Sequence, residues 1–319
     1  MENAFPNFFL IGPPKCATTA VSHYLSQHPD IFISQVKEPN YFIYSNNNPY
    51  GWPERGHATT TKSEYLQLFR NTDNCKVIGE ASPYYIYCNH CAEAMYAFAP
   101  NGKLLTILRN PVERAMSMYM YWHQNEPTCN NTSHESFRKD FLNERLVSDY
   151  NVEDKDNKNT IGWLKDMGFY GRQLQKYFSV FPENQICVLR YEDLTNDIVG
   201  TLRRIFQFLD VDPDVPIPGL DRKNVTIEPQ NRRLYNWLNL NQTSPVRKVL
   251  KTILGNVPLA HHTRQTINRL NKRSRSIKNN LPFDIYNELI ECYRSDIHEL
   301  SSLTRIDFTD WLSEQVAAA

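Results

Sequence analysis

The sequence has little glycine, no net charge and no long hydrophobic run. Its 11 glycines in 319 residues are about half of the roughly 7% that is average, so glycine-rich linkers and collagen-like repeats are excluded. The 35 Lys and Arg residues balance 35 Asp and Glu residues, which argues against a surface built for nucleic acid. No apolar stretch reaches about 18 residues, and the N-terminus lacks a basic signal-like start. We therefore expect a cytoplasmic protein that is not transmembrane and binds no nucleic acid.

Cysteine is present, but it lacks the pattern of a disulfide framework. The seven cysteines are odd in number and widely scattered, which predicts free thiols. Cys88 and Cys91 have CxxC spacing, yet a structural zinc site needs four ligands and no second pair lies at a suitable distance in the sequence. The sequence therefore predicts no metal site.

Four short apolar runs predict buried strands: residues 8–11, 77–79, 104–108 and 186–189. Each leads toward a helical pattern, and repeated strand-helix units favour a parallel sheet. Helices are expected at 18–27, from Pro111 onward with Asn110 as N-cap, at 170–178 and at 197–209. The predicted fold is α/β, a single domain over 1–319 with a central, mainly parallel sheet flanked by helices.

Other segments predict additions to this sheet. Polar stretches at about 45–61 and 125–160 are predicted to be lid-like insertions, because insertions of that length often bind ligands. Residues 246–280 form a basic segment that we expect to be helical. A closing amphipathic helix is predicted over about 282–312.

The turn GPPKCATTA, residues 12–20, lies between the first strand and its helix. Helix N-termini present free N–H groups and a positive dipole end, so this is a natural phosphate site, strengthened by Lys15, Thr18 and Thr19. The turn is P-loop-like but not a Walker A motif, because no second glycine precedes the lysine. An ordinary strand-helix turn with an exposed lysine is the alternative.

Together with LRNPVERAMS, residues 108–117, this turn resembles the sulfotransferases that use 3′-phosphoadenosine 5′-phosphosulfate (PAPS). KEPNYF at 37–42, GEASPYY at 79–85 and the stretch 168–194 are similar to the bacterial and heparan-type branch of that family. The resemblance spans nearly the whole chain and is weakest over 246–280.

The resemblance implies a set of donor-binding residues. Lys15 would contact the bridging oxygen and take part in catalysis, and the rest of the turn would hold the 5′-phosphate. Arg109 and Ser117 would bind the 3′-phosphate, although Arg109 could instead form a surface ion pair with Glu113. Tyr170 would lie near the adenine, and Arg232 in a basic loop over the 3′-phosphate. The implied cofactor-binding set is Lys15, Cys16, Ala17, Thr18, Thr19, Ala20, Arg109, Ser117, Tyr170 and Arg232.

The resemblance also implies a carboxylate base, Glu38, with Glu80 and then His123 as further candidates. Asn40 stands where the heparan-type branch has histidine, and Ile43 where it has aspartate. Aromatic residues beside these positions would suit an acceptor cavity, though aromatics are more often core. In-line sulfuryl transfer needs positioning and charge stabilisation rather than a metal.

The implied function is transfer of a sulfuryl group from PAPS to a hydroxyl, ahead of an amine, of a small-molecule acceptor. The alternatives are a carbohydrate acceptor, a P-loop-like kinase and a non-catalytic nucleotide-binding module.

The zero net charge hides an uneven distribution. Residues 246–280 contain nine Lys and Arg and no acidic residue, which leaves 26 basic against 35 acidic residues elsewhere. Apolar residues at helical spacing over 246–254 predict a short amphipathic helix. The segment is either a solvated surface or a contact for an acidic carrier or partner.

Overall fold

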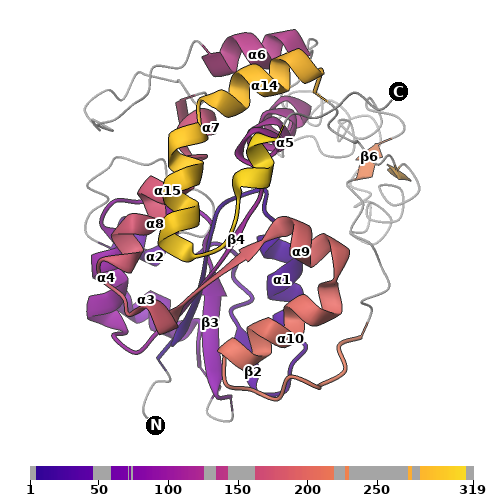
Figure 1. Ribbon diagram of the computed structural model, residues 1–319. Coiled ribbons are helices and arrows are strands. Elements are labelled where there is room, and N and C mark those ends of the chain that lie inside the picture. Colours follow the sequence, from indigo (N-terminus) through magenta and orange to yellow (C-terminus); the bar gives the residue numbers. More distant parts are fainter. Residues whose placement is uncertain are drawn as a thin grey trace, which may run out of the picture. The chain divides into compact units, whose positions relative to one another are not determined.

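A computed structural model describes residues 5–45, 59–70, 72, 75–125, 134–142, 162–218, 227–229, 272–274 and 281–313. At its centre lies a five-stranded sheet of order β2-β3-β1-β4-β5, in which every pairing is parallel (Figure 1). The α/β prediction is confirmed. The strands are β1 (Phe8–Gly12), β2 (Ile31–Ile33), β3 (Val77–Ala81), β4 (Lys103–Leu108) and β5 (Ile186–Arg190).

Strand β2 was not predicted from the sequence. It has three residues at the edge of the sheet, where Ile31 pairs with Val77 and Ile33 with Gly79. A segment this short has no readable alternation of its own. Pairing with β3, more than forty residues later in the chain, makes it a strand.

Both faces of the sheet are buried, which explains why its strands read as continuous apolar runs. Phe8 and Leu10 of β1 point to one face, whereas Phe9 and Ile11 point to the other, as the alternation of a strand requires. The first face is covered by α1 (Thr18–Leu25), α9 (Tyr191–Asn196) and α10 (Ile198–Phe208), seen beside the strands in Figure 1. Asp197 caps α10 by accepting a hydrogen bond from the Gly200 amide at 2.9 Å.

The second face carries the larger hydrophobic core, which is rich in aromatic rings. The aromatic residues expected at an acceptor cavity pack largely here: Tyr41 stacks on Tyr65 at 4.3 Å between centroids, and Phe42 meets Tyr65 and Tyr85 edge-on. The helices of this layer are α2 (Tyr41–Tyr44), α3 (Lys62–Gln67), α4 (Cys91–Phe98), α5 (Pro111–Asn125), α6 (His134–Leu142), α7 (Gly162–Asp166), α8 (Tyr170–Phe178), α14 (Phe283–Glu291) and α15 (Arg294–Thr304), with 3-10 turns η1 (Tyr85–Tyr87) and η3 (Thr309–Leu312). A further 3-10 turn, η2 (Glu183–Gln185), has no buried residue and leads into β5.

The prediction of one closing helix over 282–312 is wrong. The segment forms two helices, α14 and α15, that break at Cys292 and Tyr293, and ends in η3. The buried Tyr293 donates a hydrogen bond to the carbonyl of Lys165 at 2.8 Å. Helix α14 packs against α5 and α6, whereas α15 packs against α8. The two halves of the segment therefore take different directions, because each packs on different helices. Periodicity alone does not reveal that change of direction.

The predicted insertions are described only in part. Helix α6 lies within 125–160, and its Phe137 and Phe141 are fully buried in the larger core, so this part of the stretch is packed structure rather than a polar loop. Most other residues of the two insertions lie outside the described residues, and their role as lids stays a prediction.

By its internal packing the chain divides into two compact units, Met1–Leu220 with Leu281–Ala319, and Asp221–Asn280. The first contains the sheet. Of the second, the structure describes an antiparallel pair, β6 (Ile227–Pro229) and β7 (Lys272–Ser274). The basic segment 246–280 is therefore not helical at 272–274, where no apolar residue continues the helical spacing; its other residues lie outside the described ones.

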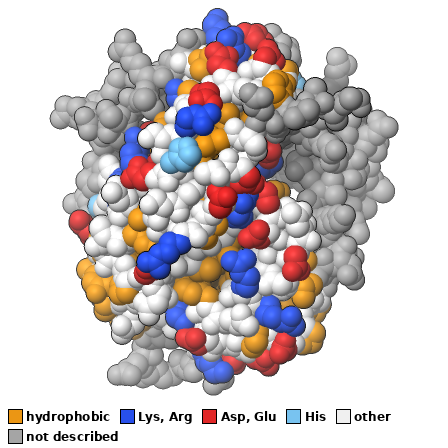
Figure 2. Space-filling model, in the orientation of Figure 1, with side chains coloured by type: hydrophobic (Ala, Val, Ile, Leu, Met, Phe, Trp, Pro, Cys, Tyr) orange, Lys and Arg blue, Asp and Glu red, His pale blue; other side chains and the backbone are white. Residues whose placement is uncertain are grey.

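The described surface carries mixed charge. Figure 2 shows acidic and basic side chains interspersed over one face, with neither sign dominating. Among the described helices, none combines the length and apolar character needed to cross a bilayer.

Candidate functional site

The turn after β1 has the backbone geometry of an anion cradle. Gly12, Lys15 and Ala17 have positive φ values of 117°, 72° and 63°. A side chain at Gly12 would lie 2.0 Å from the Pro83 carbonyl oxygen, so glycine is required there. Ala17 is the N-cap of α1 and no side chain caps the helix, so the first amides, at Thr18 and Thr19, are left to a ligand or solvent. Left-handed turns of this kind aim N–H groups at one point and bind anions.

Ala17 stands at the position where the resembled family has glycine. Because Ala17 is left-handed, we expect alanine to be strained there. We expect Ala17→Gly to raise the free energy of unfolding by about 0.5–1 kcal/mol, since it removes a strain of about 1–2 kcal/mol and adds flexibility to the unfolded chain. Urea unfolding measures the change. In the control, Ala20→Gly inside α1, stability should fall by about 1 kcal/mol. A destabilised Ala17→Gly variant would contradict the expected strain.

Lys15 and Arg109 come together at the carboxyl ends of β1 and β4. Burial lowers the pKa of Lys15, and the positive charge of Arg109 lowers it further. The Lys15 ammonium lies 4.5 Å from the centroid of the Tyr121 ring, and no carboxylate of the described residues pairs with it. Two partly buried cations that repel each other would favour an anion bound beside them.

Arg109 is held by three neighbours. Its Nε and Nη2 atoms donate to Glu113 Oε2 at 3.1 and 2.9 Å, so the ion pair considered as the alternative is present. The guanidinium lies 4.8 Å from the centroid of the Tyr191 ring, and the buried Tyr170 hydroxyl donates to the Arg109 carbonyl at 3.0 Å. Tyr170 therefore positions the end of β4. A 3′-phosphate would have to share the guanidinium with Glu113 or displace that carboxylate.

The remaining donor-site candidates are placed less directly. Ser117 is half-buried on α5, the helix that opens with Asn110 as N-cap, whose Oδ1 accepts from the Val112 and Glu113 amides at 3.1 and 3.2 Å. The Cys16 thiol is fully buried, and burial raises its pKa to about 11, which leaves it neutral. Arg232 and the side chain of His123 lie outside the described residues.

Glu38 lies in a segment with two left-handed residues, and this segment contacts the turn 12–20. Both Glu38 and Asn40 are left-handed, with φ of 51° and 50°. The Asn40 side chain donates to the Glu38 carbonyl at 2.8 Å, and the Asn40 backbone N–H donates to Ser82 Oγ at 3.1 Å. Lys37 Nζ donates to Thr19 Oγ1 at 3.3 Å. These bonds place the half-buried Glu38 beside the turn that carries Lys15.

Glu80, the second candidate base, is enclosed at the end of β3. Its carboxylate accepts hydrogen bonds from the hydroxyls of Ser82 and Tyr85, both at 2.6 Å, and of Tyr65 at 3.2 Å. Burial raises its pKa to about 7, against the effect of these hydrogen bonds and assisted by the charge of Glu38. Ser82 Oγ also accepts from the Asn40 backbone N–H, so Glu80 is linked through Ser82 to the segment that contains Glu38.

This buried carboxyl predicts a pH dependence of stability. The pKa of Glu80 is about 7 in the folded chain, against an ordinary value of 4.5 that applies to the unfolded chain. As pH rises, the unfolded chain therefore releases this proton at a lower pH than the folded chain does. Stability is therefore lost as pH rises from about 4.5 to 7, by about 3 kcal/mol from this residue. Glu80→Gln should lose that much less over the same interval in urea unfolding, whereas Glu93→Gln, on the exposed side of α4, should follow the parent. Parallel curves for Glu80→Gln and the parent would contradict the assignment.

Sequence reasoning missed two residues of this region. Tyr191 directly follows β5, and its position at the carboxyl edge of a strand was an available signal. Arg114 is fully buried on α5 and donates to the Leu164 carbonyl, while its Nε and Nη1 have no hydrogen-bond partner in the described structure. The Arg114 charge favours the ionised form of the Cys16 thiol and so opposes the rise that burial causes in its pKa, which shows that Arg114 adds positive potential at the turn 12–20. Nothing in the sequence separated it from a surface arginine.

The charged residues Lys15, Glu80 and Arg109 lie at the same edge of the sheet. The chain leaves β1 toward β2 and β3, then crosses to β4 on the other side of β1. Ligands of open α/β sheets bind at such a switch point, outside the carboxyl ends of the strands. Lys15, Glu80 and Arg109 come from or directly follow the three strands that meet there. A sulfotransferase domain model matches residues 5–301. The chain belongs to the sulfotransferase family.

Several known sulfotransferases are similar to this one. Human carbohydrate sulfotransferase 15 is 26% identical over 247 residues, covering 65% of this chain and 44% of that protein. Membrane-associated sulfotransferase kil1 of Dictyostelium discoideum is 24% identical over 301 residues, covering 73% and 62%. The sulfotransferase thus spans roughly half the length of these curated relatives.

A solved structure supports the fold. The crystal structure of a sulfotransferase from Alicyclobacillus acidocaldarius superposes with a TM-score of 0.66 at 25% identity, covering 97% of this chain and 100% of the other. Family and relatives together point to an enzyme.

Proposed function

We propose that this sulfotransferase transfers a sulfuryl group from PAPS to a hydroxyl, ahead of an amine, of an acceptor molecule. The observation that carries the proposal is the meeting of Lys15 and Arg109, from loops 94 positions apart, at one uncapped helix N-terminus. A bisphosphorylated nucleotide has two anionic groups to match these two cations. A kinase site would also need a carboxylate to hold its metal. Of the three carboxylates named at this site, Glu113 pairs with Arg109, Glu80 is buried among hydroxyl groups, and Glu38 is the proposed base.

The residues divide the chemistry between them. The acceptor oxygen forms a bond to sulfur while the bond from sulfur to the 5′-phosphate oxygen breaks, and adenosine 3′,5′-bisphosphate leaves. Lys15 and the amides of the turn stabilise the charge that grows on the leaving phosphate. Glu38 takes the acceptor proton. Arg109 and Ser117 hold the 3′-phosphate and so orient the donor. No step in this scheme calls for a metal.

The acceptor is proposed as a small hydroxyl compound, with a saccharide as the alternative that the named relatives suggest. Asn40 and Ile43, at the two positions where the heparan-type branch carries histidine and aspartate, are 3% and 1% exposed. Both side chains are therefore packed inside the described structure. This favours a different mode of acceptor binding.

A comparison of ligands tests the donor. In a thermal-shift experiment, adenosine 3′,5′-bisphosphate should stabilise the enzyme, while ATP with Mg²⁺ should stabilise it less. An acceptor screen by mass should then find products only when PAPS is supplied. Stabilisation by ATP and none by the bisphosphate would overturn the proposal. Bisphosphate binding with no transfer to any hydroxyl or amine acceptor would support the non-catalytic module.

The proposal includes a cytoplasmic location and an acidic carrier or partner at 246–280. Its support is the sequence charge pattern and the free state of the six described cysteines. Fractionation of the native cell and a pull-down compared with a chain in which the nine basic residues are neutralised would test both.

A further inference from the structure

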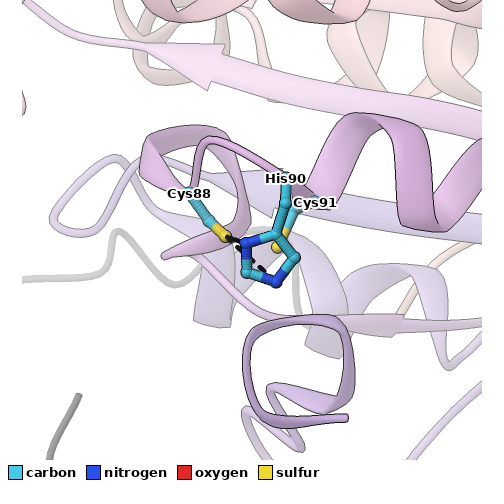
Figure 3. Close-up of side chains that lie close together, drawn as sticks. All are labelled: Cys88, His90 and Cys91. Carbon is cyan, nitrogen blue, oxygen red and sulfur yellow. Dashed lines mark hydrogen bonds between the residues drawn. The ribbon is translucent and has the colours of Figure 1, made fainter. Parts of the chain in front are cut away.

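Three potential metal ligands lie together where η1 passes into α4. The Cys88 sulfur, a ring nitrogen of His90 and the Cys91 sulfur lie within 4.8 Å of one another. Figure 3 shows the three side chains pointing toward one another, with the imidazole next to both sulfurs. The Cys88 sulfur is 3.2 Å from His90 Nδ1. The sequence indicated only a CxxC pair; the fold adds the histidine.

A backbone carbonyl fixes the protonation of the histidine. His90 Nε2 lies 2.8 Å from the Phe42 carbonyl oxygen, which can only accept, so Nε2 carries the hydrogen. In the neutral ring, Nδ1 then presents its lone pair toward Cys88. Histidines that bind metals are typically held this way, with the second nitrogen donating to a carbonyl or carboxylate.

The surroundings favour a soft or borderline cation. Cys88 and Cys91 are 3% and 0% exposed, and the described neighbours offer no carboxylate ligand. Two sulfurs and one imidazole suit Zn²⁺ and exclude Mg²⁺ and Ca²⁺, which require oxygen ligands. His90 is only half-buried, which leaves a side of the cluster from which a fourth ligand can enter.

We propose that Cys88, His90 and Cys91 bind one Zn²⁺ ion, with water as the fourth ligand. Two Zn–S bonds and one Zn–N bond form, and the thiol protons pass to the solvent. The site contains no residue proposed for sulfuryl transfer, and with three protein ligands and a water it differs from a closed structural site, which has four protein ligands. Through His90 and the Phe42 carbonyl it ties the start of α4 to α2, the helix that follows the Glu38 segment. The earlier expectation of no metal rested on counting cysteine pairs alone.

Metal titration of the full chain tests this site. Chelator-treated, reduced protein is titrated with Co²⁺ as a spectroscopic probe and then with Zn²⁺. We expect one equivalent of Co²⁺, a thiolate-to-cobalt absorption band, and its loss on adding Zn²⁺. Zn²⁺ should also raise the melting temperature by about 3–6 °C at a hundredfold excess over its Kd. Cys88→Ser and His90→Gln should abolish the stoichiometric band, whereas Cys75→Ser and Cys292→Ser should retain it.

Alkylation gives a second measurement that does not depend on the variants folding. Because Cys88 and Cys91 are buried, they react with iodoacetamide only when the chain opens locally, so the reaction is followed over time until the metal-free protein is modified at both. Zn²⁺ should slow the modification of these two residues, with peptide masses identifying the modified positions. The proposal is overturned if the parent binds no stoichiometric Co²⁺ or Zn²⁺ after reduction. It is equally overturned if the band survives Cys88→Ser, or if Zn²⁺ protects only other cysteines. These readouts do not involve the sulfuryl-transfer reaction, so they fail independently of the proposed function.

Discussion

Replacing Glu38 with glutamine is expected to slow sulfuryl transfer by ~10²–10⁴-fold, the usual contribution of a general base. Glutamine keeps the length of the side chain but cannot take the acceptor proton. The affinity for adenosine 3′,5′-bisphosphate should stay unchanged, because the proposal assigns donor binding to the turn after β1 and to Arg109. Steady-state rates with an acceptor from the screen, together with calorimetric titration of the bisphosphate, measure the two quantities separately.

The chemistry of the base can be separated from its position. In a Glu38→Ala variant, added formate or acetate should restore part of the rate if the missing function is proton removal. Glu80→Gln serves as the matched comparison: its carboxyl is enclosed by three hydroxyl donors, so small carboxylates should give it no rescue. Turnover of Glu38→Gln at the parent rate would show that another group is the base.

Replacing Arg109 with glutamine is expected to weaken binding of adenosine 3′,5′-bisphosphate by roughly 10²-fold. The substitution removes charge-assisted hydrogen bonds worth about 1.5–3 kcal/mol each to a phosphate. Adenosine 5′-phosphate lacks the 3′-phosphate and should lose much less affinity. Lys15→Gln should weaken both ligands, because the proposal assigns Lys15 to the 5′-phosphate, which both nucleotides carry. Calorimetric titration of both nucleotides into the three proteins gives the comparison.

Glu113 provides the matched control for Arg109. Glu113 Oε2 lies 2.9 Å from Arg109 Nη2, and the Glu113 side chain is partly exposed on the first turn of α5. Glu113→Gln should leave Arg109 in place and tighten the bisphosphate by a few fold, about 1 kcal/mol for a pair of this exposure. If Arg109→Gln weakens both nucleotides equally, Arg109 does not contact the 3′-phosphate. If Glu113→Gln weakens binding, the pair positions Arg109 rather than competing for it.

Much of the central fold could be predicted because its signals are local. Strands β1, β4 and β5 are apolar runs buried on both sides, and Asn110 with Pro111 opens α5 by short-range hydrogen bonds and a fixed φ. Helix α8 begins and ends at the residues expected. Strand β2 and the break at Tyr293 could not be predicted, because each is set by contacts with distant segments.

The same distinction applies to the site. The turn at 12–20 could be predicted from its position between a strand and a helix, and so could the strand-end position of Arg109. The left-handed Glu38 and Asn40, the three hydroxyls around Glu80 and the meeting of His90 with the Phe42 carbonyl depend on how separate segments pack. Sequence spacing carries no information about such approaches until the fold is known.

The sheet order also ties donor binding to folding. Lys15 and Arg109 are brought together only by the pairing of β1 with β4, where Gly12 is aligned with Thr106 and the Thr106 hydroxyl donates to the Gly12 carbonyl at 2.6 Å. No local fragment of the chain contains both cations. On the proposed assignment, a bisphosphate ligand would bind only chains in which β1 and β4 are already paired. By mass action the donor would then stabilise the folded sheet. In a cell, the supply of donor would then set how much of the enzyme resists unfolding, as well as how fast it turns over.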